Sequence, residues 1–308
     1  MANANGDGRQ PRPARRQPAR RGAIVEGANP TVRQRELGLR LRELRLTRGL
    51  TVEQVGAELL CSATKISRLE TGTRRASLRD VRDLCRAYGV TDPAEAENLM
   101  NLARQARELG WWSRYEDLRL DPFIGLEQDA AAITSYTMYY VPPLLQTPEY
   151  ARAVIRGIGR RMDARVLDQR VEARMRRQDL LEQPHPPHYR ALLDEAVLHR
   201  QVGGSVVMRA QLGKILVWAT GDKGSIQVIP FAAGAHASAD SNFDLLEFGE
   251  NTRQDPVVYV EGLVGALYHE RPTEITRYRE TIEYLRESAL SIQDSLALVA
   301  RIRDTHPA

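Results

Sequence analysis

Residues 62–75 combine short hydroxyl side chains with cations in an order that suits contact with a polyanion. The stretch reads SATKISRLETGTRR. On a helix that turns about 100° per residue, Ile66 and Leu69 fall on one side. The opposite side carries hydroxyl groups and a guanidinium: Thr64, Ser67, Arg68 and Thr71. Arg can fork to guanine, and Ser or Thr can contact bases or phosphates. The pattern therefore predicts a helix that enters the major groove of duplex DNA.

Cations continue on both sides of this predicted helix. Lys65 lies at its flank, and Arg74 and Arg75 follow where a phosphate backbone could pass. Residues 1–92 contain 19 Lys or Arg and 10 Asp or Glu, a net charge of +9, whereas the rest of the chain carries −5. This balance favours a polyanionic partner for the front half only.

The first part of the chain has almost no core-forming side chains. Residues 1–32 are rich in Gly, Pro, Arg and Ala, so we expect a disordered basic arm that adds phosphate contacts or only solubilises the protein. There is no secretory signal and no run of about 18 apolar residues. Cys61 and Cys85 are the only cysteines and have no metal-type spacing. We expect a cytoplasmic, nucleoid-associated protein without a membrane partner.

Short helical patterns surround the opening stretch throughout residues 33–106. Thr51 is a good N-cap with Gln54 as its capping-box partner, and Ser62 caps the helix that stops at Gly72. The other expected helices have the apolar stripes Leu37, Leu41 and Leu44 (ending near Gly49), Leu78, Val81, Leu84, Cys85 and Tyr88 (ending at Gly89), and Leu99 and Leu102 (starting at Asp92-Pro93). Five helices of this kind form an all-α domain.

This segment resembles the helix-turn-helix domain of the xenobiotic-response-element (phage-repressor-like) family. The matching residues are Arg45, the GLT at 49–51, Gly56 and the KISRLETG at 65–72. The resemblance implies that the start and outward face of the third helix read bases. With the flanking cations, the predicted DNA contacts are Thr51, Ser62, Ala63, Thr64, Lys65, Ser67, Arg68, Arg74 and Arg75.

The same resemblance implies a structural ion pair between Arg45 and Glu70. Glu70 lies on the inner side of the helical wheel. One position departs from the family pattern, because the turn between the second and third helices often contains Gly and this chain has Leu60. Either Leu60 is strained in a left-handed conformation, or the turn differs slightly.

Residues 107–308 form the second predicted domain. After an aromatic-rich transition over 107–150, the chain has a helix opened by Thr147-Pro148 and a charged helical segment over 165–182. Short β-rich runs then alternate with helical ones: YRALLDE, a helix over 205–218, SIQVIPF, FDLLEF, PVVYVEGLVGAL, and one broken or two paired helices over 273–303. The fold class is thus multidomain, with the all-α five-helix domain followed by an α+β regulatory domain.

The second domain also has a resemblance. The segments VPPLLQTPEYARAV, EAVLHRQVGGSVVMRAQL and IQVIPFAAGAHAS are similar to the C-terminal domain of antitoxin-like actinobacterial regulators. This resemblance implies a domain that has no established enzymatic role and receives a signal, often from a small partner protein. A small-molecule effector is the other candidate signal.

Residues with metal-binding or catalytic side chains form no convincing set. Glu195 and His199 share a helix face at i, i+4 but have no third ligand, and such a pair is usually a surface contact. His185 and His188 lie in a Pro-rich loop, and a turn-stabilising role is the commoner one for a residue such as His236. No phosphate loop, nucleophile elbow or zinc-hydrolase motif is present. We therefore predict no cofactor, no metal and no enzyme.

The sequence thus predicts a homodimeric regulator of transcription that binds specific double-stranded DNA. Its C-terminal domain would receive a signal from a small protein or ligand. The alternative is an antitoxin-like interaction protein that mainly sequesters a small partner protein.

Overall fold

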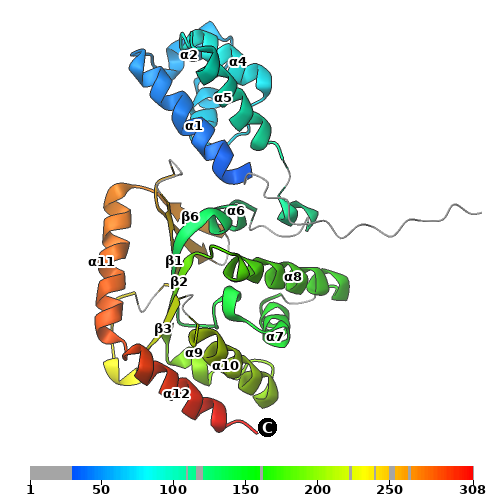
Figure 1. Ribbon diagram of the computed structural model, residues 1–308, viewed down its shortest axis with the longest axis vertical. Helices are drawn as coiled ribbons and strands as arrows, with labels where there is room; N and C mark the ends of the chain where they lie inside the picture. The colour runs from blue at the N-terminus through cyan, green and yellow to red at the C-terminus, as the bar shows by residue number, and fades with distance from the viewer. Residues whose placement is uncertain are drawn as a thin grey trace, which may run out of the picture.

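The computed structural model describes residues 30–108, 110–115, 121–159, 162–221, 224–238, 241–249, 254–262 and 265–307. Within them, a helical domain stands at one end of a larger domain built on a mixed sheet (Figure 1). This agrees with the multidomain organisation predicted from the sequence. The expected basic arm falls mainly on residues 1–29, which lie outside the described residues.

The N-terminal helices begin and end at local sequence signals. They are α1 (Pro30–Thr47), α2 (Val52–Glu58), α3 (Ala63–Glu70), α4 (Leu78–Ala87) and α5 (Pro93–Gln105). Thr51 and Gln54 form the expected capping box, and the Ser62 hydroxyl accepts a hydrogen bond from the Lys65 backbone. Gly49 and Gly89 end α1 and α4 with φ of +67°, a left-handed conformation that favours glycine.

The helical domain has its own core. Leu41, Val55, Val81 and Leu84 are fully buried and belong to one apolar cluster. However, α1 begins three residues before the domain boundary expected at residue 33. Val32, in its first turn, is 1% exposed and packs against the larger domain.

The larger domain alternates helices and strands. Its elements are η1 (Trp111–Arg114), α6 (Asp121–Asp129), β1 (Ala130–Thr137), η2 (Pro143–Leu145), α7 (Pro148–Ile158), α8 (Ala164–Arg177), η3 (Gln178–Glu182), β2 (His188–Asp194), α9 (Ala196–His199), α10 (Ser205–Ala219), β3 (Gly224–Ile229), η4 (Phe231–Ala233), β4 (Phe243–Phe248), β5 (Val257–Gly262), β6 (Gly265–His269), α11 (Pro272–Ser288) and α12 (Ile292–Asp304). In the described part, no helix is long and apolar enough to cross a bilayer.

The described strands form one six-stranded sheet in the order β3-β2-β1-β4-β5-β6. β1, β2 and β3 are parallel, and β4, β5 and β6 each pair antiparallel with their neighbours. Parallel neighbours need a crossover, which α7 and α8 provide between β1 and β2, and α9 and α10 between β2 and β3.

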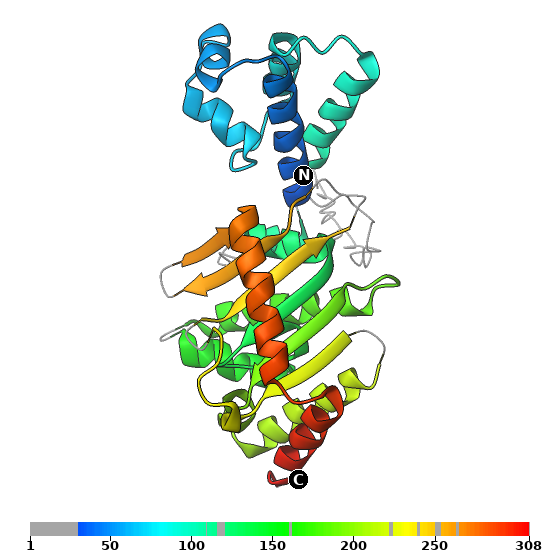
Figure 2. The same cartoon turned by 90° about the vertical axis from the view of Figure 1, so that its left-hand side faces the viewer.

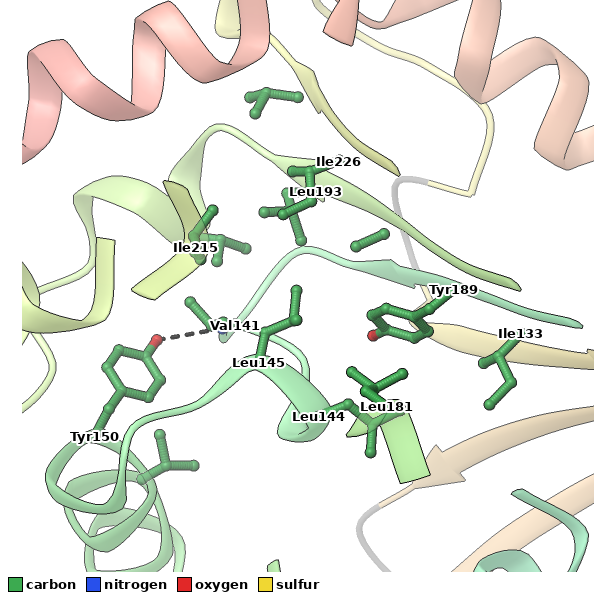
Figure 3. Packing of buried hydrophobic residues seen from close by; sticks show 14 of the residues in the cluster. Ile133, Val141, Leu144, Leu145, Tyr150, Leu181, Tyr189, Leu193, Ile215 and Ile226 are labelled. Atoms are coloured by element: carbon green, nitrogen blue, oxygen red, sulfur yellow. Dashed lines mark hydrogen bonds between the residues drawn. The ribbon is translucent and has the colours of Figure 1, made fainter. Parts of the chain in front are cut away.

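Helices cover both faces of the sheet. α11 lies across one face (Figure 2), where Leu192 packs in the same cluster as Leu285. The next residue, Leu193, points to the other face and packs with Ile215 of α10 (Figure 3). The run over 256–267, expected as a single strand, is instead two antiparallel strands, β5 and β6. β1 was not expected at all.

Candidate nucleic-acid interface

The helix α3 has one buried and one exposed side. Ile66 and Leu69 are 1% and 2% exposed and lie in the core of the helical domain. Thr64, Ser67 and Arg68 are exposed. α3 packs on α1 and α2, so the helix is fixed from behind while its polar side faces solvent.

Three guanidinium groups on and beside α3 are exposed to solvent. Arg68, Arg74 and Arg75 are exposed, and none of them forms an ion pair with another described residue. The backbone N–H of Arg74 donates to the Arg68 carbonyl at 3.0 Å, which holds the turn after α3 close to the helix. An Arg without an acidic partner keeps its donors available for phosphates or guanine.

The start of α3 and the start of α2 are polar and exposed. The hydroxyl groups of Thr51 and Ser62 accept hydrogen bonds from Gln54 N and Lys65 N, each at 3.2 Å. Each hydroxyl retains its own proton, which can be donated to a phosphate oxygen. Ala63 is half-buried beside Ser62, so only part of its methyl group is open to contact.

Lys65, by contrast, is already paired. Its Nζ donates to Asp80 Oδ1 on α4, and its side chain is only 28% exposed. Burial opposes ionisation of Asp80, but hydrogen bonds from Lys65 and Ser77 outweigh burial and lower the pKa of this carboxyl. In this structure Lys65 positions α3, and it is not a free DNA contact like the arginines.

Arg45 and Glu70 lock the end of α3 to α1. Arg45 Nε and Nη2 donate to the two Glu70 oxygens at 2.8 Å each, in the pairing that the family resemblance implied. The Tyr88 hydroxyl donates to the same carboxylate at 3.0 Å. The hydrogen bond to Glu70 is the main cause that raises the pKa of Arg45. Arg45 and Glu70 are 8% and 4% exposed, so the pair is a buried structural element.

The turn between α2 and α3 is tight. A Cβ added to Gly56 would lie 2.8 Å from the Cys61 carbonyl oxygen, so no larger residue fits there. Leu60 adopts φ of +51° and is 94% exposed. The first alternative raised by the sequence is therefore realised: Leu60 has a left-handed backbone that an L-residue adopts only at a cost.

The capped α2–α3 pair, its tight turn and its cationic outer side define a helix-turn-helix DNA-binding domain. Residues 36–99 match the model of a helix-turn-helix domain. Residues 120–301, more than half of the chain, match a domain of unknown function, DUF5753, and the chain belongs to this family. No curated protein and no solved structure matches the chain.

His199 and His236 follow the carboxyl ends of the parallel strands β2 and β3, whereas His188 is the first residue of β2 and His185 lies in the loop before it. Glu195 accepts from the Phe231 backbone at 2.7 Å, and its other oxygen is 3.2 Å from His199 Nε2. His236 Nε2 is 2.9 Å from the Tyr136 hydroxyl. These contacts fix the loop after β3. Among the described residues, no three His, Cys, Asp or Glu side chains gather as a metal site.

A buried polar cluster lies beneath α6, and sequence reasoning missed it. Arg177 of α8 donates to both oxygens of Glu127 at 2.8 and 2.7 Å, with side chains only 6% and 3% exposed. Ser135 of β1 donates to Asp244 of β4, and burial raises the pKa of Asp244 to about 6. Glu127 falls in the segment interpreted as a transition, so no periodic pattern pointed to it.

Proposed function

We propose that the protein is a transcriptional regulator that binds specific double-stranded DNA sequences through α2 and α3. The observation that carries this proposal is Arg68, an unpaired guanidinium on the exposed side of a helix anchored from behind by Ile66 and Leu69. Arg74 and Arg75 supply phosphate contacts and make binding salt-dependent.

The proposed DNA-bound form is a homodimer. One helix-turn-helix domain reads only a few base pairs, and two copies read half-sites about 34 Å apart, one helical turn of DNA. The C-terminal domain is proposed to receive a signal from a small protein or a small-molecule effector. The support for this signalling role is the connection that α1 makes between the domains, because its residues lie in the cores of both.

Genome-wide binding, followed by salt-titrated binding to a recovered site, tests the proposal. Arg68→Ala is expected to reduce the ratio of operator to random-DNA affinity by at least about fivefold, since a forked Arg–guanine contact contributes about 1–3 kcal/mol of discrimination. Arg86→Ala, which removes an exposed and unpaired Arg from α4, is the matched control and should leave the ratio unchanged. An unchanged ratio for Arg68→Ala would reject its role as base reader.

A pull-down from the native host tests the signalling part. A sensor role is supported if a small protein co-purifies in stoichiometric amount and operator binding changes when this protein is added. A partner that binds while no genomic site is occupied favours the sequestering alternative. Thermal-shift screening against metabolites tests for a small-molecule effector.

A further inference from the structure

The first six residues of α1 lie outside both matched regions. The helix-turn-helix match begins at residue 36, whereas α1 begins at Pro30. This extension carries α1 down to the sheet domain, where α1 packs on α6 (Figure 1). Val32 is 1% exposed and shares a cluster with Phe123 and Leu126 of α6. The extension therefore joins the two domains through an apolar contact.

A second contact fixes the other side of the extension. Arg35 Nη1 donates to Glu270 Oε1 at 2.8 Å, and the two side chains are 16% and 47% exposed. Glu270 lies in the short turn that follows β6 and precedes α11. α1 is thus held between α6 and this turn, so its position depends on both.

Residues 34–38 of α1, which overlap this extension, touch the end of α3 without an intervening layer of side chains. A Cβ on Gly38 would lie 2.6 Å from the Glu70 carbonyl oxygen, and a Cβ on Gly72 would lie 3.0 Å from Arg35 Cα. Gln34 Nε2 also donates to the Gly72 carbonyl. Because packed backbones cannot pass through each other, a shift of α1 must move α3 or break this contact.

We propose that Glu270 is a positioning residue for DNA reading: through Arg35 it holds α1, and α1 holds α3, at a fixed place relative to the C-terminal domain. This inference rests on the proposed function and names how the C-terminal domain acts on the DNA-binding site. A signal that displaces α6 or the β6–α11 turn reaches α3 through one turn of α1. The buried Arg177–Glu127 pair ties α6 to α8, so a movement of α8 has the same route.

Charge reversal in the full-length protein tests the proposal. Glu270→Arg places two cations together and is expected to lower operator affinity about three- to tenfold, because repulsion replaces the attraction that holds α1. Arg35→Glu should act in the same direction, and the double variant Arg35→Glu/Glu270→Arg should recover most of the affinity. The charge-matched controls are Glu287→Arg on α11 and Arg42→Glu on α1, both exposed and unpaired.

Hydrogen exchange without DNA gives a readout that does not depend on the proposed function. Glu270→Arg should speed exchange of the Thr71 and Gly72 amides at the end of α3, in the helical domain. The double variant Arg35→Glu/Glu270→Arg should slow this exchange again. If wild type binds no specific DNA site, the proposed function fails, while hydrogen exchange still tests whether the Arg35–Glu270 contact holds α1 and α3 in place. If wild type binds its operator and Glu270→Arg behaves as Glu287→Arg does in both assays, the inference is overturned.

Discussion

Lys65 on α3 and Asp80 on α4 form an ion pair that joins the helix proposed to read DNA to the helix behind it. The other oxygen of Asp80 accepts from the backbone and hydroxyl of Ser77 and closes the capping box of α4. One carboxylate therefore fixes both the start of α4 and the first turn of α3. The ammonium of Lys65 therefore helps to orient α3 against α4.

Asp80→Asn is expected to release Lys65 toward DNA. The amide oxygen can still accept from Ser77, but it no longer holds the ammonium. One additional phosphate contact should steepen the dependence of log affinity on log salt by about 0.9 for random DNA. The ratio of operator to random-DNA affinity should fall, because the first turn of α3 is less well fixed. Salt-titrated anisotropy measures both quantities.

The control for this variant is Asp80→Asn/Lys65→Met. Without the ammonium, the salt slope should return to its wild-type value while the loss of operator preference persists. A slope that does not change in Asp80→Asn alone would mean that Lys65 cannot reach a phosphate.

Glu70→Ala is expected to unfold the helical domain before it alters sequence preference. The substitution leaves Arg45 buried without a carboxylate and removes the acceptor of Tyr88. Breaking one partner of a buried pair costs about 3–5 kcal/mol. Urea unfolding of the full chain, followed by exchange of α3 amides, measures the loss. Arg45→Met/Glu70→Leu should be markedly more stable than Glu70→Ala, and equal stabilities would contradict a buried-charge explanation.

The helices of the N-terminal domain could be predicted from the sequence because the residues that start and end them act locally. Ser62 and Thr51 cap helices within three residues of themselves, and Gly72 takes a left-handed conformation just after α3. The exposure of Arg68 follows from helical periodicity alone, since Ile66 and Leu69 fix the buried side.

Features that depend on partners far away in the sequence could not be predicted. The helical wheel gives the direction of Lys65 but not that Asp80, 15 residues later, would bind it. Val32 looked like part of an arm because α6, which buries it, lies about 90 residues further along the chain. β1 was missed because its start, Ala130–Ala132, has no β-branched residue, whereas pairing with β2 and β4 decides its conformation.

Asp244 should make the stability of the sheet domain depend on pH. Burial raises its pKa in the folded state to about 6, with Glu127 and Glu261 adding to the effect while Ser135 and Arg177 oppose it. The folded state therefore binds a proton more tightly than the unfolded chain does. The resulting stabilisation is complete below about pH 4 and is lost as the pH rises through about 6.

Comparison with Asp244→Asn isolates the contribution of Asp244 to the pH dependence of stability, because the amide resembles the protonated acid and does not titrate. Between about pH 4 and pH 7, the free energy of unfolding of wild type should fall relative to that of the variant by up to about 3 kcal/mol. Urea titrations monitored by Trp fluorescence measure this, since Trp112 and Trp218 lie in the sheet domain. Parallel pH profiles would show that the pKa of Asp244 is the same in the folded and unfolded states.

Leu60→Gly is expected to stabilise the helical domain. Leu60 has φ of +51° and is 94% exposed, so its left-handed backbone is strained and its side chain buries almost nothing. Relief of about 1–2 kcal/mol of strain exceeds the added backbone entropy of glycine, about 0.5–1 kcal/mol. Leu46→Gly is the matched control: Leu46 is 57% exposed but helical, so this variant should melt at a lower temperature. If Leu60→Gly also melts at a lower temperature, the strain relieved at this position is smaller than the entropy cost of glycine, and the prediction is wrong.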